Sequence, residues 1–459
     1  MTFPKEFEIR MRKILGDEYE SFAASYEKQP SRGLHVNLHK ISVRDFAECA
    51  DFPIGKIGFS PEAFTFDCEK IGNHPLHHAG AFYVQEPTAM IPLAMLDATD
   101  LRSRPELRVL DMCASPGGKS SQAANLFAGR GGFLLSNEYV PNRALTLAEN
   151  IERLGIAPAA VTNLDTGVLA NDCAGMFDLT VVDAPCSGEG MFRKNPDASA
   201  MWSTDNVAIC AARQSKILSD AAQTVAVGGY LLYSTCTFSV EENEATVAGF
   251  LDNFPDFEPV YPDAAICGIT DKGISNGKYD MSFCRRAYPH ISGGEGQFAA
   301  LFLRVSGPQS DKKRNIRNIN AEKPDKSEEK LIRAFLCETI GDTLAAELAV
   351  FGRKDGFYIV DRLACLPSKG VLSPGVKLGE IRKGRVVPHH RFFMAYGKHF
   401  INKFEMDRRQ AEAYIRGDTV ACDRFCGYGA AVFCGCTLGA VKVSDGVAKN
   451  HYPKGLRIR

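Results

Sequence analysis

Between residues 106 and 305, short apolar segments alternate with longer amphipathic ones, and this alternation restricts the fold more than any other feature of the chain. Short apolar runs separated by amphipathic helices are typical of a parallel sheet with helices on both faces. Right-handed crossovers between such strands favour a doubly wound, Rossmann-like α/β fold. The predicted strands are Leu107–Asp111, Gly132–Asn137, Ala160–Leu164, Leu179–Asp183 and Tyr230–Ser234, with a late antiparallel strand at Phe298–Val305, and the predicted helices include Ala144–Leu154 and Ala208–Ala226.

The segments on either side of this region have different patterns. Residues 1–105 begin with apolar positions at helical spacing and continue with a strand-like segment at Leu34–Leu38, which predicts a small α+β N-terminal module. Residues 306–330 carry almost no apolar side chain to bury, so they predict a solvated linker between domains.

Two further units follow the linker. A helix predicted over Leu331–Leu348 opens a unit that extends to residue 385, and glycine-punctuated short strands from Gly427 predict a small β-barrel within residues 386–459. Basic residues of the segment 381–410 are interleaved with Phe392, Phe393, Tyr396 and Phe400. This pattern suits RNA, because phosphates attract cations and unstacked bases stack on aromatic rings. A solvated basic surface over a small core remains the alternative.

Composition and charge exclude several classes of protein. A hydrophobic fraction of 45% and a charged fraction of 24% are those of a soluble globular protein, and 459 residues predict two to four domains. With a net charge of -1, any affinity for nucleic acid must come from local basic patches. We expect a cytoplasmic protein with no membrane association, because no stretch of 18 apolar residues is present and the N-terminus has no apolar leader. Fifteen scattered cysteines indicate reduced thiols.

A cofactor loop is predicted directly after the first strand, at Ala114-Ser115-Pro116-Gly117-Gly118-Lys119. The glycines let the backbone approach a ligand, and the following helix start offers unpaired N–H groups. Glu138 ends the second strand, where a carboxylate can bind two ribose hydroxyls, and Asp165 ends the third, where it suits an adenine amine. The glycine pair alone could be a tight turn or another nucleotide site. Three features at successive strand ends favour a cofactor site.

Two cysteines follow the fourth and fifth strands. Cys186 lies in Asp183-Ala184-Pro185-Cys186-Ser187-Gly188, and Cys236 lies in Ser234-Thr235-Cys236-Thr237. In a doubly wound sheet these strands are neighbours, about 5 Å apart, and both loops open at the carboxyl edge where ligands bind. We therefore expect both thiols to face one pocket. The alternative is that they are ordinary small buried residues, as most cysteines are.

Such a thiol pair has a use in cytosine chemistry. Carbon 5 of cytosine is a poor nucleophile until a thiolate adds to carbon 6, which makes carbon 5 enamine-like and able to accept a methyl group from a sulfonium. A second thiol can then assist expulsion of the first. Thiolate formation needs a positive or hydrogen-bonding environment, for which Lys119, Arg193 and Lys194 are candidates. Asp183 is a candidate for binding the N3/N4 edge of the base.

The motifs around these residues resemble the RsmB/RsmF/Nop/Sun family of RNA cytosine-C5 methyltransferases. The resemblance rests on Asp111–Lys119, Asp183–Gly190 and Ser234–Thr237, continues through Arg286, Pro289-His290 and Gly293–Gly296, and covers roughly residues 30–305. It implies a class I S-adenosylmethionine-dependent methyltransferase domain over residues 106–305, with S-adenosylmethionine as the cofactor.

The resemblance also implies a role for each site residue. Cys236 would be the catalytic nucleophile and Cys186 the cysteine that assists release, with Asp183 as the third catalytic residue. The cofactor site would consist of Ala114–Lys119, Glu138, Arg143, Asp165 and Asp183. The sequence departs from the family at His35, where an arginine often stands, so no RNA contact is assigned to this position.

The C-terminal part narrows the resemblance to the bacterial RsmF subgroup. Tyr414–Asp418, Gly427–Ala430, Leu438-Gly439 and Lys449–Arg457 look like its PUA-type domain. This implies an RNA-binding N-terminal family module at 1–105, a connecting domain at 331–385 and a PUA-like RNA-binding domain at 386–459. The implied partner is 16S rRNA near the decoding site, or the 30S subunit, and we expect a monomer.

Four late cysteines, Cys422, Cys426, Cys434 and Cys436, do not have the spacing of a zinc ribbon or finger, so we predict no metal site. Cys434 and Cys436 are predicted to share one face of a strand.

Three other functions compete with 16S rRNA methylation. The resemblance also allows a tRNA cytosine-5 methyltransferase, because relatives in this family modify tRNA. A catalytically inactive RNA-binding ribosome assembly factor would not need both cysteines and every cofactor residue, all of which are present. A methyltransferase acting on protein or on a small molecule has no evident use for a thiol pair, so this alternative ranks last.

Overall fold

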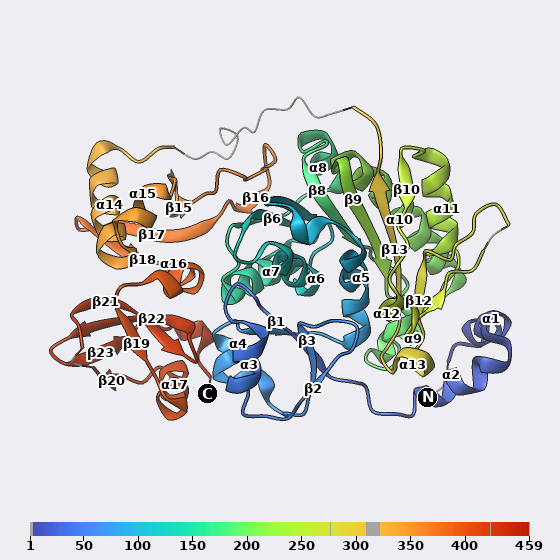
Figure 1. The fold of residues 1–459 in the computed structure, drawn as a ribbon, viewed down its shortest axis with the longest axis horizontal. Coiled ribbons are helices and arrows are strands. Elements are labelled where there is room, and N and C mark those ends of the chain that lie inside the picture. The colour runs from blue at the N-terminus through green and yellow to red at the C-terminus, as the bar shows by residue number, and fades with distance from the viewer. Residues whose placement is uncertain (1–2, 276, 309–321, 423, 459) are drawn as a thin grey trace.

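A ten-stranded mixed sheet forms the centre of the computed structural model, which describes residues 3–275, 277–308, 322–422 and 424–458 (Figure 1). Its order is β11-β12-β13-β9-β8-β5-β6-β7-β16, and β10 pairs with β13. The strands are β5 (Glu106–Asp111), β6 (Gly131–Asn137), β7 (Ala159–Thr162), β8 (Phe177–Asp183), β9 (Val225–Thr235), β10 (Phe257–Pro259), β11 (Asp271–Lys272), β12 (Arg285–Ala287), β13 (Gln297–Arg304) and β16 (Val371–Ser373).

The middle of this sheet is parallel and doubly wound. From β5 the chain adds β6 and β7 on one side and β8 and β9 on the other, all in parallel register, so the predicted Rossmann-like fold is confirmed. The predicted late strand is β13, which runs antiparallel to β9. All carboxyl ends of the parallel strands therefore meet at one edge.

Helices cover both faces of the sheet, and the side chains of each strand alternate between two cores. Val109 and Leu110, which are adjacent on β5, belong to opposite hydrophobic clusters. One cluster includes the helices α5 (Ile91–Ala94), α6 (Gly118–Ala124) and α7 (Pro141–Leu154), and the other includes α8 (Thr166–Asp172), α10 (Thr204–Thr224) and α11 (Glu244–Asn253). The short helices α9 (Pro196–Met201), α12 (Ala264–Cys267) and α13 (Pro289–Ser292) lie on loops of the same domain.

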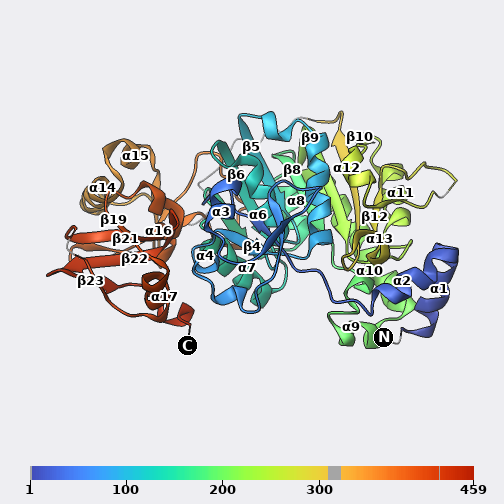
Figure 2. The ribbon, with the colours of Figure 1, turned by 60° about the horizontal axis from the view of Figure 1, so that its bottom comes forward.

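The N-terminal segment divides into two parts that pack in different places. Its first two helices, α1 (Lys5–Leu15) and α2 (Tyr19–Ser25), pack against Phe192, Trp202, Phe238 and Tyr288 of the central domain, close to α13 (Figure 2). The remainder forms a four-stranded antiparallel sheet of order β2-β3-β1-β4. The elements of this remainder are β1 (Gly33–Val36), α3 (Val43–Cys49), β2 (Ile54–Lys56), β3 (Ala63–Phe66), α4 (Pro75–His78) and β4 (Phe82–Val84).

The helix predicted over Leu331–Leu348 is in fact two helices, α14 (Lys326–Ile340) and α15 (Asp342–Glu347). Gly341 separates them with a φ of 83°, which a residue with a side chain rarely adopts. Asp325 caps α14 and forms a capping box with Glu328, so the helix begins inside the segment predicted as a linker. Residues 309–321 of that segment lie outside the described residues.

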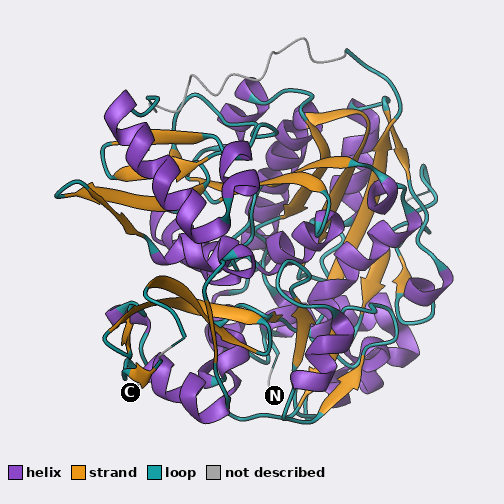
Figure 3. Ribbon diagram, turned by 60° about the vertical axis from the view of Figure 1, so that its left-hand side comes forward, coloured by secondary structure: helices purple, strands orange, loops and turns teal. Residues whose placement is uncertain are grey.

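Two sheets make up the C-terminal part (Figure 3). The first has the order β14-β15-β17-β18 and the second, a half-barrel, has the order β19-β21-β22-β23-β20. The elements are β14 (Val350–Arg353), β15 (Gly356–Ile359), β17 (Val376–Arg382), β18 (Arg385–Pro388), α16 (His390–Tyr396), β19 (Lys403–Glu405), α17 (Arg408–Arg416), β20 (Val420–Ala421), β21 (Gly427–Phe433), β22 (Cys436–Ser444) and β23 (Val447–Asn450).

The units are joined by shared sheets and cores that the sequence pattern did not indicate. Strand β16 comes from the segment predicted as a separate connecting domain, yet it pairs antiparallel with β7 of the central sheet. The N-terminal sheet and the half-barrel share one hydrophobic cluster, and His78 Nδ1 lies 2.7 Å from the hydroxyl of Tyr452 across that contact.

The three phenylalanines singled out in the basic segment 381–410 are core residues rather than a stacking surface for bases. Phe392 and Phe393 are 0% exposed and Phe400 is 3% exposed, and all three pack in one cluster with residues of α14 and β22. Buried rings cannot stack on splayed bases, so the RNA interpretation of these aromatic residues is wrong.

No helix among the described residues combines the length and the apolar character needed to cross a membrane.

Candidate active site

The two cysteines singled out from the sequence meet at the carboxyl edge of the sheet. Strands β8 and β9 are parallel neighbours, with Asp183 opposite Ser234, and each strand leads directly into one cysteine loop. The Sγ atoms of Cys186 and Cys236 are 3.3 Å apart, and both residues are half-buried. The expected convergence of the two thiols on one place is thus confirmed.

The loop of Cys186 is held by side chains on both sides of the cysteine. Gln214, on α10, donates from Nε2 to the carbonyl oxygen of Pro185 at 2.9 Å. The backbone N–H of Ser187 donates to Oε2 of Glu242, also at 2.9 Å. Fixing the residues before and after Cys186 restricts where its sulfur can point.

The loop of Cys236 is fixed through its backbone. Gly190 donates its N–H to the carbonyl oxygen of Cys236 at 2.9 Å, and a Cβ at position 190 would lie only 2.9 Å from that oxygen. Asn243 accepts from the hydroxyl of Thr235 at 2.7 Å and donates to the carbonyl of Thr237 at 2.9 Å. Only glycine fits at 190, because the two loops approach each other too closely for a side chain.

Asp183, the third predicted catalytic residue, is the last residue of β8, three positions before Cys186, and is bound on both oxygens. Its Oδ1 accepts from the hydroxyl of Ser234 at 2.8 Å, and its Oδ2 forms an ion pair with Nζ of Lys119 at 2.9 Å. Lys119 is 7% exposed. This ion pair connects the cofactor loop after β5 to the two cysteine loops, so both predicted sites lie side by side.

The three cations predicted to favour a thiolate are each paired with a carboxylate. Lys119 binds Asp183, whereas Arg193 and Lys194 bind Glu295 at 3.0 and 3.7 Å. A hydrogen bond with the Cys236 sulfur, together with burial, raises the pKa of the Cys186 thiol well above its ordinary value. Cys186 therefore keeps its proton and can donate it in a hydrogen bond to Cys236.

The predicted cofactor loop has the backbone geometry that its glycines indicated. Gly117 has a φ of 113°, and a Cβ at Gly118 would lie 3.1 Å from the ring of Tyr83, on β4. Ser115 and Arg143 are joined by two hydrogen bonds, from the Ser115 hydroxyl to the Arg143 carbonyl at 2.9 Å and from Arg143 Nη2 to the Ser115 carbonyl at 3.0 Å. The N-terminal sheet thus packs directly behind the loop, a contact that the sequence did not predict.

The acidic residues predicted at the strand ends are in place. Glu138 follows β6, is 6% exposed, accepts from the N–H of Val140 at 2.9 Å and lies 3.4 Å from Arg143. Asp165 follows β7 and caps α8 by accepting from the N–H of Gly167, with Lys216 at 3.6 Å. Both carboxylates are on the same edge of the sheet as the thiols.

Several residues around the site had no signal in the sequence. Glu242 and Asn243 belong to a polar run after Cys236, and residue type alone does not separate the buried acid of such a run from exposed ones. Asp111 precedes the glycine loop, and its residue type gives no sign that it is buried. It is 0% exposed, its Oδ2 accepts from the Ser120 hydroxyl at 2.7 Å, and burial raises its pKa to about 7.

Other residues considered from the sequence lie elsewhere. His35 is 0% exposed, lies 2.9 Å from the Ser121 hydroxyl and stacks on Tyr83, so it supports α6, the helix after the glycine loop, and is not exposed to RNA. Cys434 and Cys436 do not share a strand face. Cys434 has a φ of 50° and lies, with Gly435, in the turn between β21 and β22.

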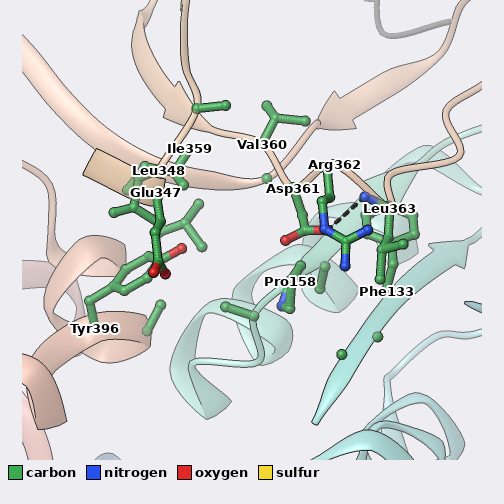
Figure 4. Close-up of a pocket in the computed structure, with 18 of the residues that line it drawn as sticks. Phe133, Pro158, Glu347, Leu348, Ile359, Val360, Asp361, Arg362, Leu363 and Tyr396 are labelled. Carbon is green, nitrogen blue, oxygen red and sulfur yellow. Dashed lines mark hydrogen bonds between the residues drawn. The ribbon is translucent and has the colours of Figure 1, made fainter. Parts of the chain in front are cut away.

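A cavity of about 740 Å³ lies at the opposite, amino edge of the sheet (Figure 4). Its walls are the first residues of β6 and β7 and the segment from Ile359 to Leu363, and Tyr396 and Glu347 lie on one side. Because the cysteine loops follow the carboxyl ends of the strands, this cavity takes no part in the site.

Comparisons with known families agree with this arrangement. The family described as 16S rRNA methyltransferase RsmB/F matches residues 98–303. Two further models match the flanking parts: the N-terminal domain of 16S rRNA methyltransferase RsmF over residues 3–87, and the methyltransferase RsmF PUA domain over residues 401–458.

Individual relatives are similar over nearly the whole chain. A protein of Erwinia tasmaniensis named ribosomal RNA small subunit methyltransferase F is 31% identical over 475 residues, covering 99% of this chain and 96% of that protein. A protein of the same name from Vibrio cholerae is 28% identical, covering 99% and 98%. Among solved structures, a methyltransferase homolog protein from Pyrococcus horikoshii is 27% identical with a TM-score of 0.56, covering 65% of this chain and 95% of that one. The fold also matches NSun6 from Pyrococcus horikoshii with SFG, at 20% identity and a TM-score of 0.55, covering 66% and 99%.

Proposed function

The chain belongs to the RsmB/F family of 16S rRNA methyltransferases, and from this premise we propose that it methylates carbon 5 of a cytosine in 16S rRNA through a covalent adduct on Cys236. The family makes it an S-adenosylmethionine-dependent RNA methyltransferase. The observation that carries the proposal is the pair of thiols, with sulfurs 3.3 Å apart, next to the Asp183–Lys119 ion pair.

The residues of the cofactor loop fit S-adenosylmethionine. We assign its binding to Ala114–Lys119, Glu138, Arg143, Asp165 and Asp183, because the strand-end carboxylates suit ribose hydroxyls and an adenine amine. Gly117 holds a left-handed conformation, and a Cβ at Gly118 would press on the ring of Tyr83 at 3.1 Å. When bound, this cofactor supplies a methyl group activated as a sulfonium.

Replacing Glu138 by glutamine tests this assignment directly. An amide can accept only on one oxygen, so it binds two ribose hydroxyls less well than the carboxylate does, and a hydrogen bond to a charged group contributes about 1.5–3 kcal/mol. We expect the Kd for S-adenosylmethionine to rise roughly tenfold to a hundredfold. Isothermal titration calorimetry measures the change, and Glu149→Gln, on the same helix as Arg143, serves as the control. An unchanged Kd for E138Q would remove Glu138 from the site.

Cys236 starts the reaction in this proposal. Its thiolate adds to carbon 6 of the cytosine, forming a carbon–sulfur bond, and the electrons of the 5,6 double bond become available at carbon 5. Cys186 supports the thiolate, because it retains its own proton and lies within hydrogen-bonding distance of the Cys236 sulfur. Carbon 5 then takes the methyl group and still carries its hydrogen.

The second half of the reaction restores the aromatic ring. A base removes the proton from carbon 5, the electron pair of that C–H bond re-forms the 5,6 double bond, and the bond from carbon 6 to Cys236 breaks with its electrons returning to sulfur. We assign the assistance of this step to Cys186, since it is the group 3.3 Å from the departing sulfur. Cys186 passes its own proton to the departing Cys236 sulfur, and the Cys186 thiolate so formed takes the proton from carbon 5, so both thiols end protonated. The raised pKa of Cys186 makes that thiolate the stronger base.

Asp183 is assigned to the N3/N4 edge of the cytosine. Ser234 and Lys119 hold its carboxylate in one orientation, and this preorganisation is what a group that binds a reacting base requires.

Methylation of purified RNA tests the proposed function as a whole. The protein is incubated with S-adenosylmethionine and either 16S rRNA, 30S subunits or tRNA, and 5-methylcytosine is mapped by bisulfite sequencing. We expect one or a few bisulfite-resistant cytosines in 16S rRNA and none in tRNA. Methylation of tRNA instead would favour the transfer RNA alternative, and RNA binding without any new methylcytosine would favour an inactive assembly factor.

A further inference from the structure

Glu242 is a fully buried carboxylate that contacts the neighbours of both cysteines. It is 0% exposed. Ser187, which follows Cys186, donates its N–H to Oε2 at 2.9 Å and its hydroxyl to Oε1 at 2.5 Å. Thr237, which follows Cys236, donates its hydroxyl to Oε1 at 3.3 Å, and the two hydroxyls lie 2.9 Å from each other. The Glu242 side chain therefore forms hydrogen bonds with the residue that follows each of the two cysteines.

We propose that Glu242 is a positioning residue that holds Cys186 and Cys236 at reacting distance by binding the residue that follows each of them. The proposal rests on the proposed function, because it concerns the spacing that the two-thiol reaction needs. Glu242 acts through hydrogen bonds with Ser187, Thr237 and Gln214 rather than through contact with either cysteine sulfur.

A carboxylate is suited to this place by its chemistry. All of its partners are donors, namely the N–H and hydroxyl of Ser187, the hydroxyl of Thr237 and Nε2 of Gln214 at 2.8 Å. Gln214 also donates to the carbonyl of Pro185, the residue before Cys186. A buried acceptor that satisfies these donors ties α10 and both loops together, whereas an apolar side chain would leave them unpaired.

The charge of Glu242 also affects the pKa of the Cys186 thiol. The carboxylate accepts from a backbone N–H of the Cys186 loop, that of Ser187, whereas it contacts the Cys236 loop only through the side chain of Thr237. The titratable groups that face Cys186 are Cys236, Tyr233 and Glu242, and those around Glu242 include Glu189 and Cys210. A negative charge disfavours a second one nearby, so Glu242 adds to the rise of the Cys186 pKa. Cys186 therefore keeps its proton, which suits it to hydrogen-bond to the attacking sulfur and to act in the later release step.

The charge effect is tested without any need for methylation activity. Cys236→Ser and the double variant Cys236→Ser with Glu242→Gln are alkylated with iodoacetamide across a pH series, and labelling of Cys186 is measured by mass spectrometry of its peptide. The glutamine can keep the hydrogen bonds, with its oxygen facing Ser187 N–H and Gln214 and its amide donating to the hydroxyls. Only the charge is lost, so we expect the midpoint of labelling to fall by about one pH unit.

Glu241→Gln in the same Cys236→Ser background is the matched control. Glu241 is adjacent in sequence, but it binds Arg10 and Ser239 rather than the cysteine loops, so its charge should leave the midpoint unchanged. Equal midpoints with and without the Glu242 charge would overturn the electrostatic part of the inference.

The positioning effect is tested with Glu242→Asp in the otherwise unchanged protein. Aspartate keeps the charge but is one methylene shorter, so it cannot reach both loops. We expect kcat to fall at least about tenfold while KM for RNA stays within about twofold, because the ground-state contacts with substrate are unaltered. Thermal melting of E242D and E242Q separates this from unfolding. Wild-type kcat in a folded E242D variant would overturn the positioning role, whereas absence of C5 methylation by the wild-type protein would instead overturn the proposed function.

Discussion

Replacing Cys236 by alanine is expected to reduce methyl transfer by about 10⁴-fold or more, because the variant has no nucleophile to activate carbon 5. Carbon 5 in the intact aromatic ring does not attack a sulfonium at a useful rate, and Cys186 cannot simply take over. Its loop is fixed by Gln214 and Glu242, and its pKa is raised, so it remains a thiol and is a poor nucleophile. Transfer of labelled methyl groups from S-adenosylmethionine to 16S rRNA measures the loss.

The variant should lose chemistry and keep binding. Cys236 makes no contact with Glu138 or with the glycine loop in the described structure, so C236A should bind S-adenosylmethionine within about twofold of the wild-type Kd. Cys337→Ala, on α14 in a different unit, controls for the loss of any thiol. Retained methylation by C236A would refute the nucleophile assignment, and a parallel loss of cofactor binding would point to misfolding instead.

The central sheet was predictable because its signal is local. Each parallel strand is a short apolar run, and the order of strand ends places Glu138, Asp183 and Cys236 on one edge without knowledge of any contact. The same reasoning gave the approach of the two thiols, since adjacent parallel strands leave little freedom for the first residues after them.

Features that depend on packing between distant segments could not be predicted. Phe392 and Phe393 lie in a basic stretch that looks like an RNA surface, yet burial against α14 makes them core residues, and nothing in the local pattern distinguishes these cases. Strand β16 joins the central sheet from more than sixty residues after β13, and its three residues carry no local signal for a partner so far away in sequence. Such partners are set by tertiary contacts rather than by local sequence.

The residues that hold the two cysteine loops in place could not be predicted from the sequence for a related reason. Glu242 and Glu241 are neighbours of the same residue type, yet one is 0% exposed at the junction of the two cysteine loops and the other is half-exposed and bound to Arg10.

The prediction for Cys434 was wrong because a turn was missed. Read as part of a continuous strand, it should share a face with Cys436, but Gly435 allows a tight turn that separates them.

Replacing Cys186 by alanine should give a different result from the loss of Cys236, and the difference distinguishes their roles. In C186A the nucleophile remains, so the adduct on carbon 6 can form and carbon 5 can be methylated. Release then lacks the group that lies 3.3 Å from the departing sulfur, and general acid–base assistance of such a step contributes about 10²–10⁴-fold. We expect multiple turnover to fall by about 10²-fold or more and RNA to remain covalently bound to the protein, visible as a slowly migrating, protease-sensitive band on a denaturing gel.

The double variant C186A/C236A decides whether that band has the proposed chemistry. If the adduct is a bond between Cys236 and carbon 6, removing Cys236 as well must abolish the band, and Cys210→Ala, a change at a buried cysteine on α10, must not produce one. A band that survives in the double variant would mean that another nucleophile binds the RNA. Absence of any band in C186A, with turnover unchanged, would mean that the second thiol takes no part in release, and the 3.3 Å approach of the two sulfurs would then need an explanation other than catalysis.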